Sequence, residues 1–168
     1  FNNQPQWSLD YIRKYWGAQM QSPLFNGAWH EAWDIASWKS DFGTTSHAWC
    51  AGPTALLSQK VLGVEPLSAG WKTFSVKPNI CDLKWAKGII PTPNGKINIE
   101  WKRSEKEFEM NINVPNGSNA VVSLTSNKIK AIKINGMKLT SSGKKYSVDK
   151  ANRTVQFQIS PGEFKITS

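Results

Sequence analysis

The residues with the clearest chemical potential lie in one stretch of the first half of the chain. Residues 27–34 (GAWHEAWD) and 44–53 (TTSHAWCAGP) bring a carboxylate, Glu31, and an imidazole, His47, into a tryptophan-rich setting. Aromatic rings stack on the apolar face of a pyranose while a few polar groups bind its hydroxyls. A carboxylate in such a setting can act as a base near neutral pH. This composition favours a sugar-processing site.

Four tryptophans accompany this pair and would supply the stacking surfaces. His30 directly precedes Glu31 and is a further candidate, either to contact substrate or to orient the carboxylate. Asp34 and Asp41 could line the same pocket, although loop carboxylates more often cap turns and helices. The alternative is that the indoles form a hydrophobic core and that Glu31 pairs with a lysine or a backbone amide. The tryptophans concerned are Trp29, Trp33, Trp38 and Trp49.

Two helices are expected to position these residues. Residues 6–21 carry apolar side chains at spacings of three and four, which predicts an amphipathic helix with Ser8 as its N-cap. Residues 45–62 predict a second helix, capped by Thr45 or Ser46, with Gly63 ending it in the left-handed conformation. Pro53 would kink this helix or mark a later start. Residues 22–43 show no clean period and are expected to form a long ordered loop.

From Trp71 onward the apolar period changes to two, and turn signals such as Pro-Asn-Gly and Asn-Gly separate the segments. This pattern predicts an antiparallel β-sandwich. The chain as a whole is therefore expected to be α+β, with residues 1–66 as a helical unit and 67–168 as the sandwich. The expected strands are 73–76, 96–101, 108–114, 120–124, 129–134, 154–159 and 164–166.

Charge and tryptophan content divide the chain in the same way. Residues 1–80 carry a net charge of +1 and residues 81–168 carry +8, while all nine tryptophans lie between Trp7 and Trp101. The lysines of the second half are scattered and not interleaved with aromatic residues, so a solvated sheet face is favoured over nucleic-acid binding. No apolar run approaches a membrane span. Neither a cofactor nor a metal is expected, and the two cysteines, Cys50 and Cys81, are expected to be free thiols.

Several motifs together resemble the C-terminal portion of bacterial α-L-rhamnosidases, glycoside hydrolase family 78. They occur in order over roughly residues 7–102, and their order and spacing are more specific than any one of them. The motifs are YIRKYWGAQMQ, WHEAWD, TTSHAWCAGPTALLSQKVLGV, GWKTFSVKP and LKWAKGIIPTPNGKINIEW.

The resemblance implies a fold. The catalytic domain of that family is an (α/α)6 barrel followed by a β-sandwich, so this chain would hold the terminal barrel helices and the sandwich. Two helices and a loop do not close a core by themselves, and a missing upstream barrel region would be the partner that completes them.

The resemblance also implies chemistry, the inverting release of terminal α-L-rhamnose from a glycan or glycoside. Glu31 matches the general base in a Glu-x-Trp pattern, His47 a ligand of a sugar hydroxyl, and Trp33 an aromatic residue at the edge of the site. A one-residue slip would instead put His30 at the position of the base. The general acid has no counterpart here, so the chain alone is expected to be inactive.

A function of another class stays open on the sequence. The chain could be a non-catalytic carbohydrate-binding or structural β-sandwich module whose helices dock a larger partner. In that case sugar affinity would depend on sandwich residues such as Trp85 or Trp101 and would survive the substitution Glu31→Gln.

Overall fold

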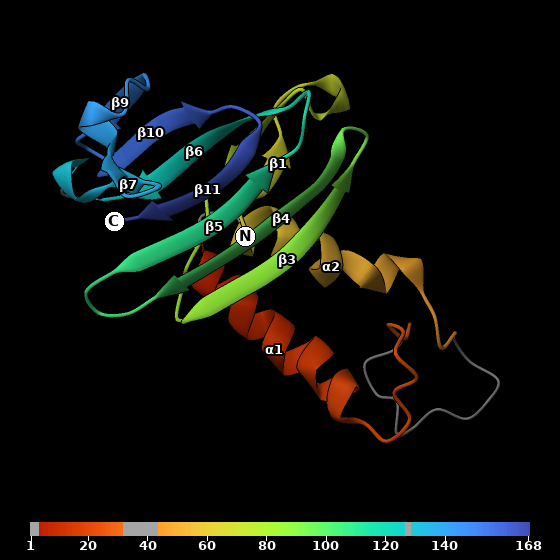
Figure 1. Cartoon of the computed structure of the whole chain (residues 1–168). Coiled ribbons are helices and arrows are strands. Elements are labelled where there is room, and N and C mark those ends of the chain that lie inside the picture. The colour runs from red at the N-terminus through yellow and green to blue at the C-terminus, as the bar shows by residue number, and fades with distance from the viewer. Residues whose placement is uncertain (1–3, 32–43, 127–128) are drawn as a thin grey trace. The chain divides into compact units, whose positions relative to one another are not determined.

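The computed structural model describes residues 4–31, 44–126 and 129–168. The chain divides into two units, residues 1–57 and 58–168 (Figure 1). Among these described residues, the first unit holds one long helix and most of a second helical segment, and the second unit holds two β-sheets. This combination confirms the expected α+β mixture.

Helix α1 (Pro5–Gln21) matches the predicted helix closely at both ends. Pro5 stands in the first turn, where its missing N–H leaves no intrahelical bond unmade. The prediction that Ser8 is the N-cap is wrong. Gln4 holds that position, and the Ser8 hydroxyl, one turn further on, donates to the Gln4 carbonyl at 3.2 Å. The helix ends at Gln21, and its C-cap residue Ser22 is extended because a proline follows it.

The second helical segment begins later than predicted. It consists of a 3-10 turn η1 (Ala48–Ala51), helix α2 (Gly52–Leu56) and a π-helical turn η2 (Leu57–Val61). No side chain caps η1, so the prediction of a cap at Thr45 or Ser46 is wrong. Pro53 lies in the first turn of α2, which makes it the mark of a late start and not a kink. The division between the two units falls within this segment.

Gly63 follows η2 in the left-handed conformation, as predicted, with φ 78°. A Cβ atom at this position would lie 2.1 Å from the backbone carbonyl carbon of Lys77. The Lys77 N–H also donates to the Gly63 carbonyl at 2.9 Å. The close approach of these two backbones therefore requires glycine.

The first sheet of the sandwich has five strands. Its strands pair antiparallel except for β2 and β6, which run parallel, so the prediction of a wholly antiparallel sandwich is wrong at this pair. In spatial order the strands are β1 (Val64–Pro66), β2 (Thr73–Val76), β6 (Asn119–Thr125), β10 (Thr154–Ile159) and β9 (Tyr146–Asp149).

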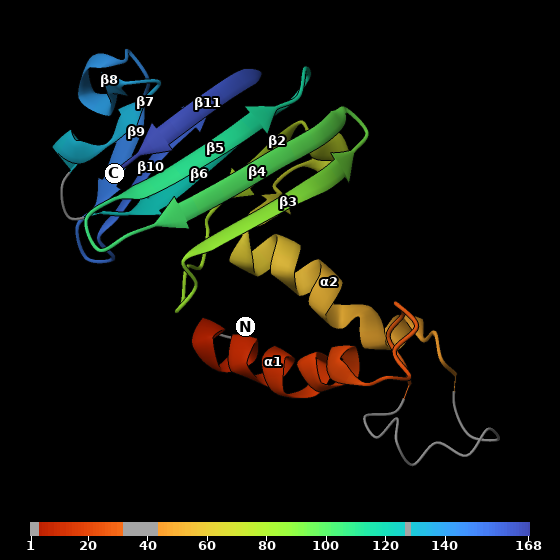
Figure 2. The ribbon, with the colours of Figure 1, turned by 60° about the horizontal axis from the view of Figure 1, so that its bottom comes forward.

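The second sheet has six strands, all antiparallel, and it lies face to face with the first (Figures 1 and 2). Short 3-10 turns join some of the strands, namely η3 (Ala69–Trp71), η4 (Ile129–Ala131) and η5 (Leu139–Ser141). In spatial order the strands are β3 (Trp85–Thr92), β4 (Gly95–Arg103), β5 (Phe108–Val114), β11 (Gly162–Thr167), β7 (Lys133–Ile134) and β8 (Met137–Lys138).

Most predicted strands are confirmed, but 129–134 is not one continuous strand. It is the turn η4 followed by the two-residue strand β7. The sequence reading also missed β1, β3, β8 and β9.

The core of the sandwich lies between the two sheets and is built by alternation along the strands. Phe74 and Phe157 of the first sheet are at most 2% exposed, and Ile99 and Trp101 of the second sheet are equally buried. The Trp101 indole N–H donates to the Val61 carbonyl at 3.2 Å, so the polar atom of this large ring is satisfied in the interior. Burial of Trp101 excludes it as a sugar-binding residue, whereas Trp85 is 65% exposed.

Candidate functional site

Two backbone hydrogen bonds bring the motif residues of the helical unit together. The Glu31 N–H donates to the Thr44 carbonyl at 3.1 Å, and the His47 N–H donates to the Trp29 carbonyl at 2.8 Å. These bonds join segment 29–31 to segment 44–47 across the intervening chain. The two residues that the sequence reading singled out, Glu31 and His47, therefore lie beside each other.

The Glu31 carboxylate is held by the start of the second segment. Its Oε2 atom accepts the Thr44 backbone N–H at 2.9 Å, and the Thr44 hydroxyl lies 3.5 Å from the same oxygen. His47 Nδ1 lies 3.8 Å from this oxygen and 3.3 Å from the Thr44 hydroxyl. The Glu31 side chain is 44% exposed and that of His47 27% exposed. The cluster is thus oriented by hydrogen bonds and open to a ligand.

The tryptophans predicted to surround this pair differ in their environment. Trp29 is half-buried, packs at a tilt against Phe25 and donates its indole N–H to the Thr54 hydroxyl at 3.3 Å. Trp49 is 91% exposed and lies edge-on to His47, with ring centroids 5.8 Å apart. Of the described aromatic residues, Trp49 presents the most ring surface to a ligand. Trp33, Trp38, Asp34 and Asp41 lie outside the described residues.

His30 has a different setting from its neighbour Glu31. Its side chain is 1% exposed and stacks on Phe25 with ring centroids 6.2 Å apart. Gln19 of helix α1 holds the His30 backbone on both sides: its Oε1 accepts the His30 N–H at 3.2 Å and its Nε2 donates to the His30 carbonyl at 3.4 Å. This clamp fixes the residue directly before Glu31.

A second pair of contacts ties Glu31 to the helices. The Trp16 indole N–H of α1 donates to the Cys50 carbonyl at 2.6 Å, and the Cys50 thiol lies 3.6 Å from the Glu31 carbonyl oxygen. Sequence reasoning missed the positioning residues Thr44, Gln19 and Trp16. Only Thr44 gave a signal, because it starts the Thr-Thr-Ser run before the predicted second helix.

Residues 4–31, 44–126 and 129–168 contain no group of three or more His, Cys, Asp or Glu side chains placed to hold a metal ion. Among the same residues, no helix is long and apolar enough to cross a membrane. Cys50 and Cys81 are half-buried and form no disulfide, as expected.

Comparison with known proteins shows first what the sandwich is similar to. Residues 63–138 match the family described as "Bacterial alpha-L-rhamnosidase C-terminal domain". The α-L-rhamnosidase of Streptomyces avermitilis, solved in complex with L-rhamnose, superposes on 83% of this chain with a TM-score of 0.69 at 14% identity. The α-L-rhamnosidase of Dictyoglumus thermophilum covers the same share with a TM-score of 0.68 at 21% identity.

The sequence relationship points the same way. An α-L-rhamnosidase of Alteromonas sp. (strain LOR) is 36% identical over 56 residues, or 33% of this chain. The chain is therefore similar to the C-terminal part of bacterial α-L-rhamnosidases, and the resemblance inferred from the sequence motifs is confirmed. The chain spans only 6% of the length of the Alteromonas relative, and 13% and 16% of the Streptomyces and Dictyoglumus chains.

Proposed function

We propose that this chain is the C-terminal part of an inverting glycoside hydrolase that releases terminal α-L-rhamnose, with Glu31 as the general base. In this proposal its helices are the last helices of an (α/α)6 barrel, and residues 67–168 are the sandwich that follows. The observation that carries the proposal is the Glu31 cluster. A carboxylate fixed by the Thr44 N–H at 2.9 Å stands beside a histidine and an exposed indole.

The contacts suit the work of a base. With Oε2 held by Thr44, the plane of the carboxylate is set, and Oε1 is the oxygen that would take the proton of an attacking water. His47 would bind a sugar hydroxyl through its ring, and Trp29, Trp33, Trp38 and Trp49 would line the subsite of the cleaved sugar and that of the leaving group. His30 stays a predicted substrate contact, although its burial suits a positioning role better.

Inversion needs a second carboxyl group on the opposite face of the sugar, at roughly 6.5–9.5 Å from the first. In the proposal this general acid comes from the barrel region upstream of the chain. The 168-residue chain alone would then lack measurable rhamnosidase activity.

The test is to join the chain to the upstream region of its own gene and to assay hydrolysis of an aryl α-L-rhamnoside. Glu31→Gln is expected to lower kcat by about 10²–10⁴-fold, because the substitution removes the base but keeps the shape of the side chain. Glu105→Gln is the matched control, since Glu105 is exposed in the sandwich unit and should leave kcat unchanged. NMR of the first product should show β-L-rhamnose.

Three outcomes would each contradict a part of the proposal. Activity that survives Glu31→Gln removes the general base. The α-anomer as first product removes inversion. Rhamnoside hydrolysis by the purified 168-residue chain removes the need for an upstream acid.

A further inference from the structure

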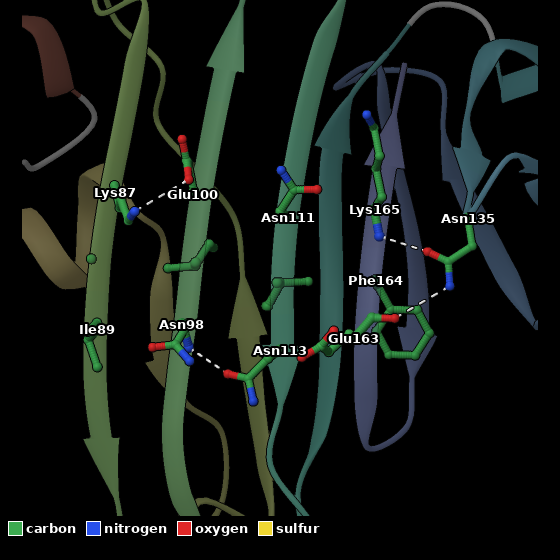
Figure 3. Close-up of a pocket in the computed structure, with 13 residues that line it drawn as sticks. Lys87, Ile89, Asn98, Glu100, Asn111, Asn113, Asn135, Glu163, Phe164 and Lys165 are labelled. Atoms are coloured by element: carbon green, nitrogen blue, oxygen red, sulfur yellow. Dashed lines mark hydrogen bonds and ion pairs between the residues drawn. The ribbon is translucent and has the colours of Figure 1, made fainter.

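A hollow of about 700 Å³ lies over the outer face of the second sheet, the face turned away from the sandwich core. Figure 3 shows side chains from β3, β4, β5 and β11 pointing into it, with Asn135 from the turn between β7 and β8 at one end. Because all these elements belong to one sheet, the floor of the hollow is a continuous hydrogen-bonded surface.

The strand register arranges the floor in rows that cross the sheet. One row runs from Lys87 on β3 through Glu100 and Asn111 to Lys165 on β11. In the next row Ile89 pairs with Asn98, and Asn113 pairs with Glu163. Residues on one face of adjacent strands are side-chain neighbours, so the first row presents a line of polar groups and the second presents polar groups beside Ile89.

The charges on this face largely compensate one another. Glu109 accepts from Lys165 at 2.8 Å and from Lys102 at 3.1 Å, and Lys87 lies 3.8 Å from Glu100. The two lysines hold the pKa of Glu109 at about 2, so this carboxylate stays ionised. A strongly anionic ligand would therefore have to compete with carboxylates already in place, and the face favours a neutral one.

Asparagine amides supply the groups that such a ligand would use. Each amide carries two donors and an acceptor, which match the mixed donor and acceptor character of sugar hydroxyls. Asn98 and Asn111 are exposed on the floor. Asn113 is oriented because its Oδ1 accepts the Asn98 backbone N–H at 2.7 Å. Asn135 is fixed by accepting the Lys165 N–H at 2.8 Å.

A sugar site also needs apolar surface to contact the ring faces of the sugar, and strand β3 supplies it. Ile89 lines the hollow and is 58% exposed. Trp85, four residues earlier on the same face of the strand, is 65% exposed. An exposed indole is costly to leave in water without a role and is the preferred surface for stacking on a pyranose.

We propose that the outer face of β3, β4, β5 and β11 binds a neutral polysaccharide chain. The asparagine amides bind its hydroxyls, and Ile89 and Trp85 contact its apolar ring faces. This binding face contains no residue of the helical unit. Its ability to bind a polysaccharide is therefore independent of the role of Glu31 as the general base.

The test is affinity electrophoresis of the full 168-residue chain in native gels containing one polysaccharide each. The neutral probes are a rhamnan, a galactomannan, a xyloglucan and a dextran, and polygalacturonate is the anionic probe. We expect at least one neutral polymer to retard the chain in a way that 0.5 M NaCl does not abolish. The double variant Asn98→Ala/Asn111→Ala should weaken that binding by about tenfold or more, from the loss of two side chains that each form hydrogen bonds.

Two further variants sharpen the result. Trp85→Ala should also weaken the retardation, whereas Gln158→Ala should not, because Gln158 is an exposed amide on the other sheet. Circular dichroism checks that each variant is folded. The proposal is overturned if no neutral polymer retards the chain, if only polygalacturonate does so, which would reflect the net charge of +9, or if the folded double variant binds as tightly as the unmodified chain.

Discussion

The helical unit and the sandwich present their exposed polar groups on different kinds of support. In the helical unit, the Glu31 carboxylate depends on two backbone hydrogen bonds between irregular segments and on clamps such as that of Gln19. In the sandwich, the asparagine rows stand on strands that are bonded on both sides. Irregular backbone can bring unlike residues to one point, as a catalytic cluster requires. A sheet repeats a spacing, which suits a ligand that is itself a repeat.

The largest effect expected in the sandwich is that of Trp101→Ala. Trp101 is fully buried, and its loss leaves a cavity and an unpaired Val61 carbonyl. The free energy of unfolding should fall by about 3–5 kcal/mol in urea denaturation. Trp101→Phe, which keeps most of the ring volume, should cost less. A loss below about 1 kcal/mol for the alanine variant would show that the core is not organised around this indole.

The next effect concerns two glycines with similar φ angles and different surroundings. Gly63→Ala should destabilise by about 3 kcal/mol or more, because left-handed strain is added to a clash with the Lys77 backbone. Gly70→Ala should cost only about 1 kcal/mol, since Gly70 has φ 65° but no atom within 4 Å of the added Cβ. Equal losses, measured by urea denaturation, would mean that the close approach at Gly63 relaxes freely.

The substitution His47→Ala tests the helical unit, after two tests of the sandwich. In the chain joined to its upstream region, kcat/KM for an aryl rhamnoside should fall by about tenfold, mainly through KM, because a hydrogen bond to substrate is lost. The urea midpoint should not move, since the His47 ring is partly exposed. His47→Asn, which keeps a donor, should recover part of the loss. An unchanged kcat/KM would remove His47 from the site.

The smallest expected effect is the pH-dependent contribution of Glu109 to the free energy of unfolding. Hydrogen bonds from Lys165 and Lys102 lower the pKa of this carboxyl from 4.5 to about 2. Its ionised form therefore stabilises the fold above pH 4.5, and this contribution is lost as the pH falls through 2. Glu109→Gln should lower the free energy of unfolding at pH 7, and the difference from the unmodified chain should close near pH 2. Glu105→Gln, with its exposed side chain, should show a smaller change at pH 7.

Sequence reasoning succeeded where one periodic pattern covered a whole element. Strands β5 and β10 were predicted with their observed bounds because buried and exposed residues alternate along them. Strand β9 has no buried residue and β3 is interrupted by Gly88 and Pro91, so neither gave a clean period. The η4 turn was mistaken for a strand because Ile132 and Ile134 alternate just beyond it.

The same limit applies to the sites. The motif spacing indicated that Glu31 and His47 act together, and the two segments do lie side by side. The Gln19 clamp could not be foreseen, because a hydrogen bond from a helix to an irregular segment leaves no repeat in the sequence. The hollow was also missed. Its floor depends on the register between β5 and β11, which lie some fifty residues apart in the chain and are matched only by folding.

The strand order has a consequence for how the sandwich can be divided. The stretch that matches the known C-terminal domain family stops at residue 138, before β9, β10 and β11. Both sheets need those later strands: β6 pairs with β10, and β5 pairs with β11. Cut at residue 138, the domain would carry two unprotected strand edges in its centre, and such edges readily pair with those of other molecules. The matched stretch is therefore not a removable module, and its solubility depends on the C-terminal strands β9, β10 and β11 that complete the two sheets.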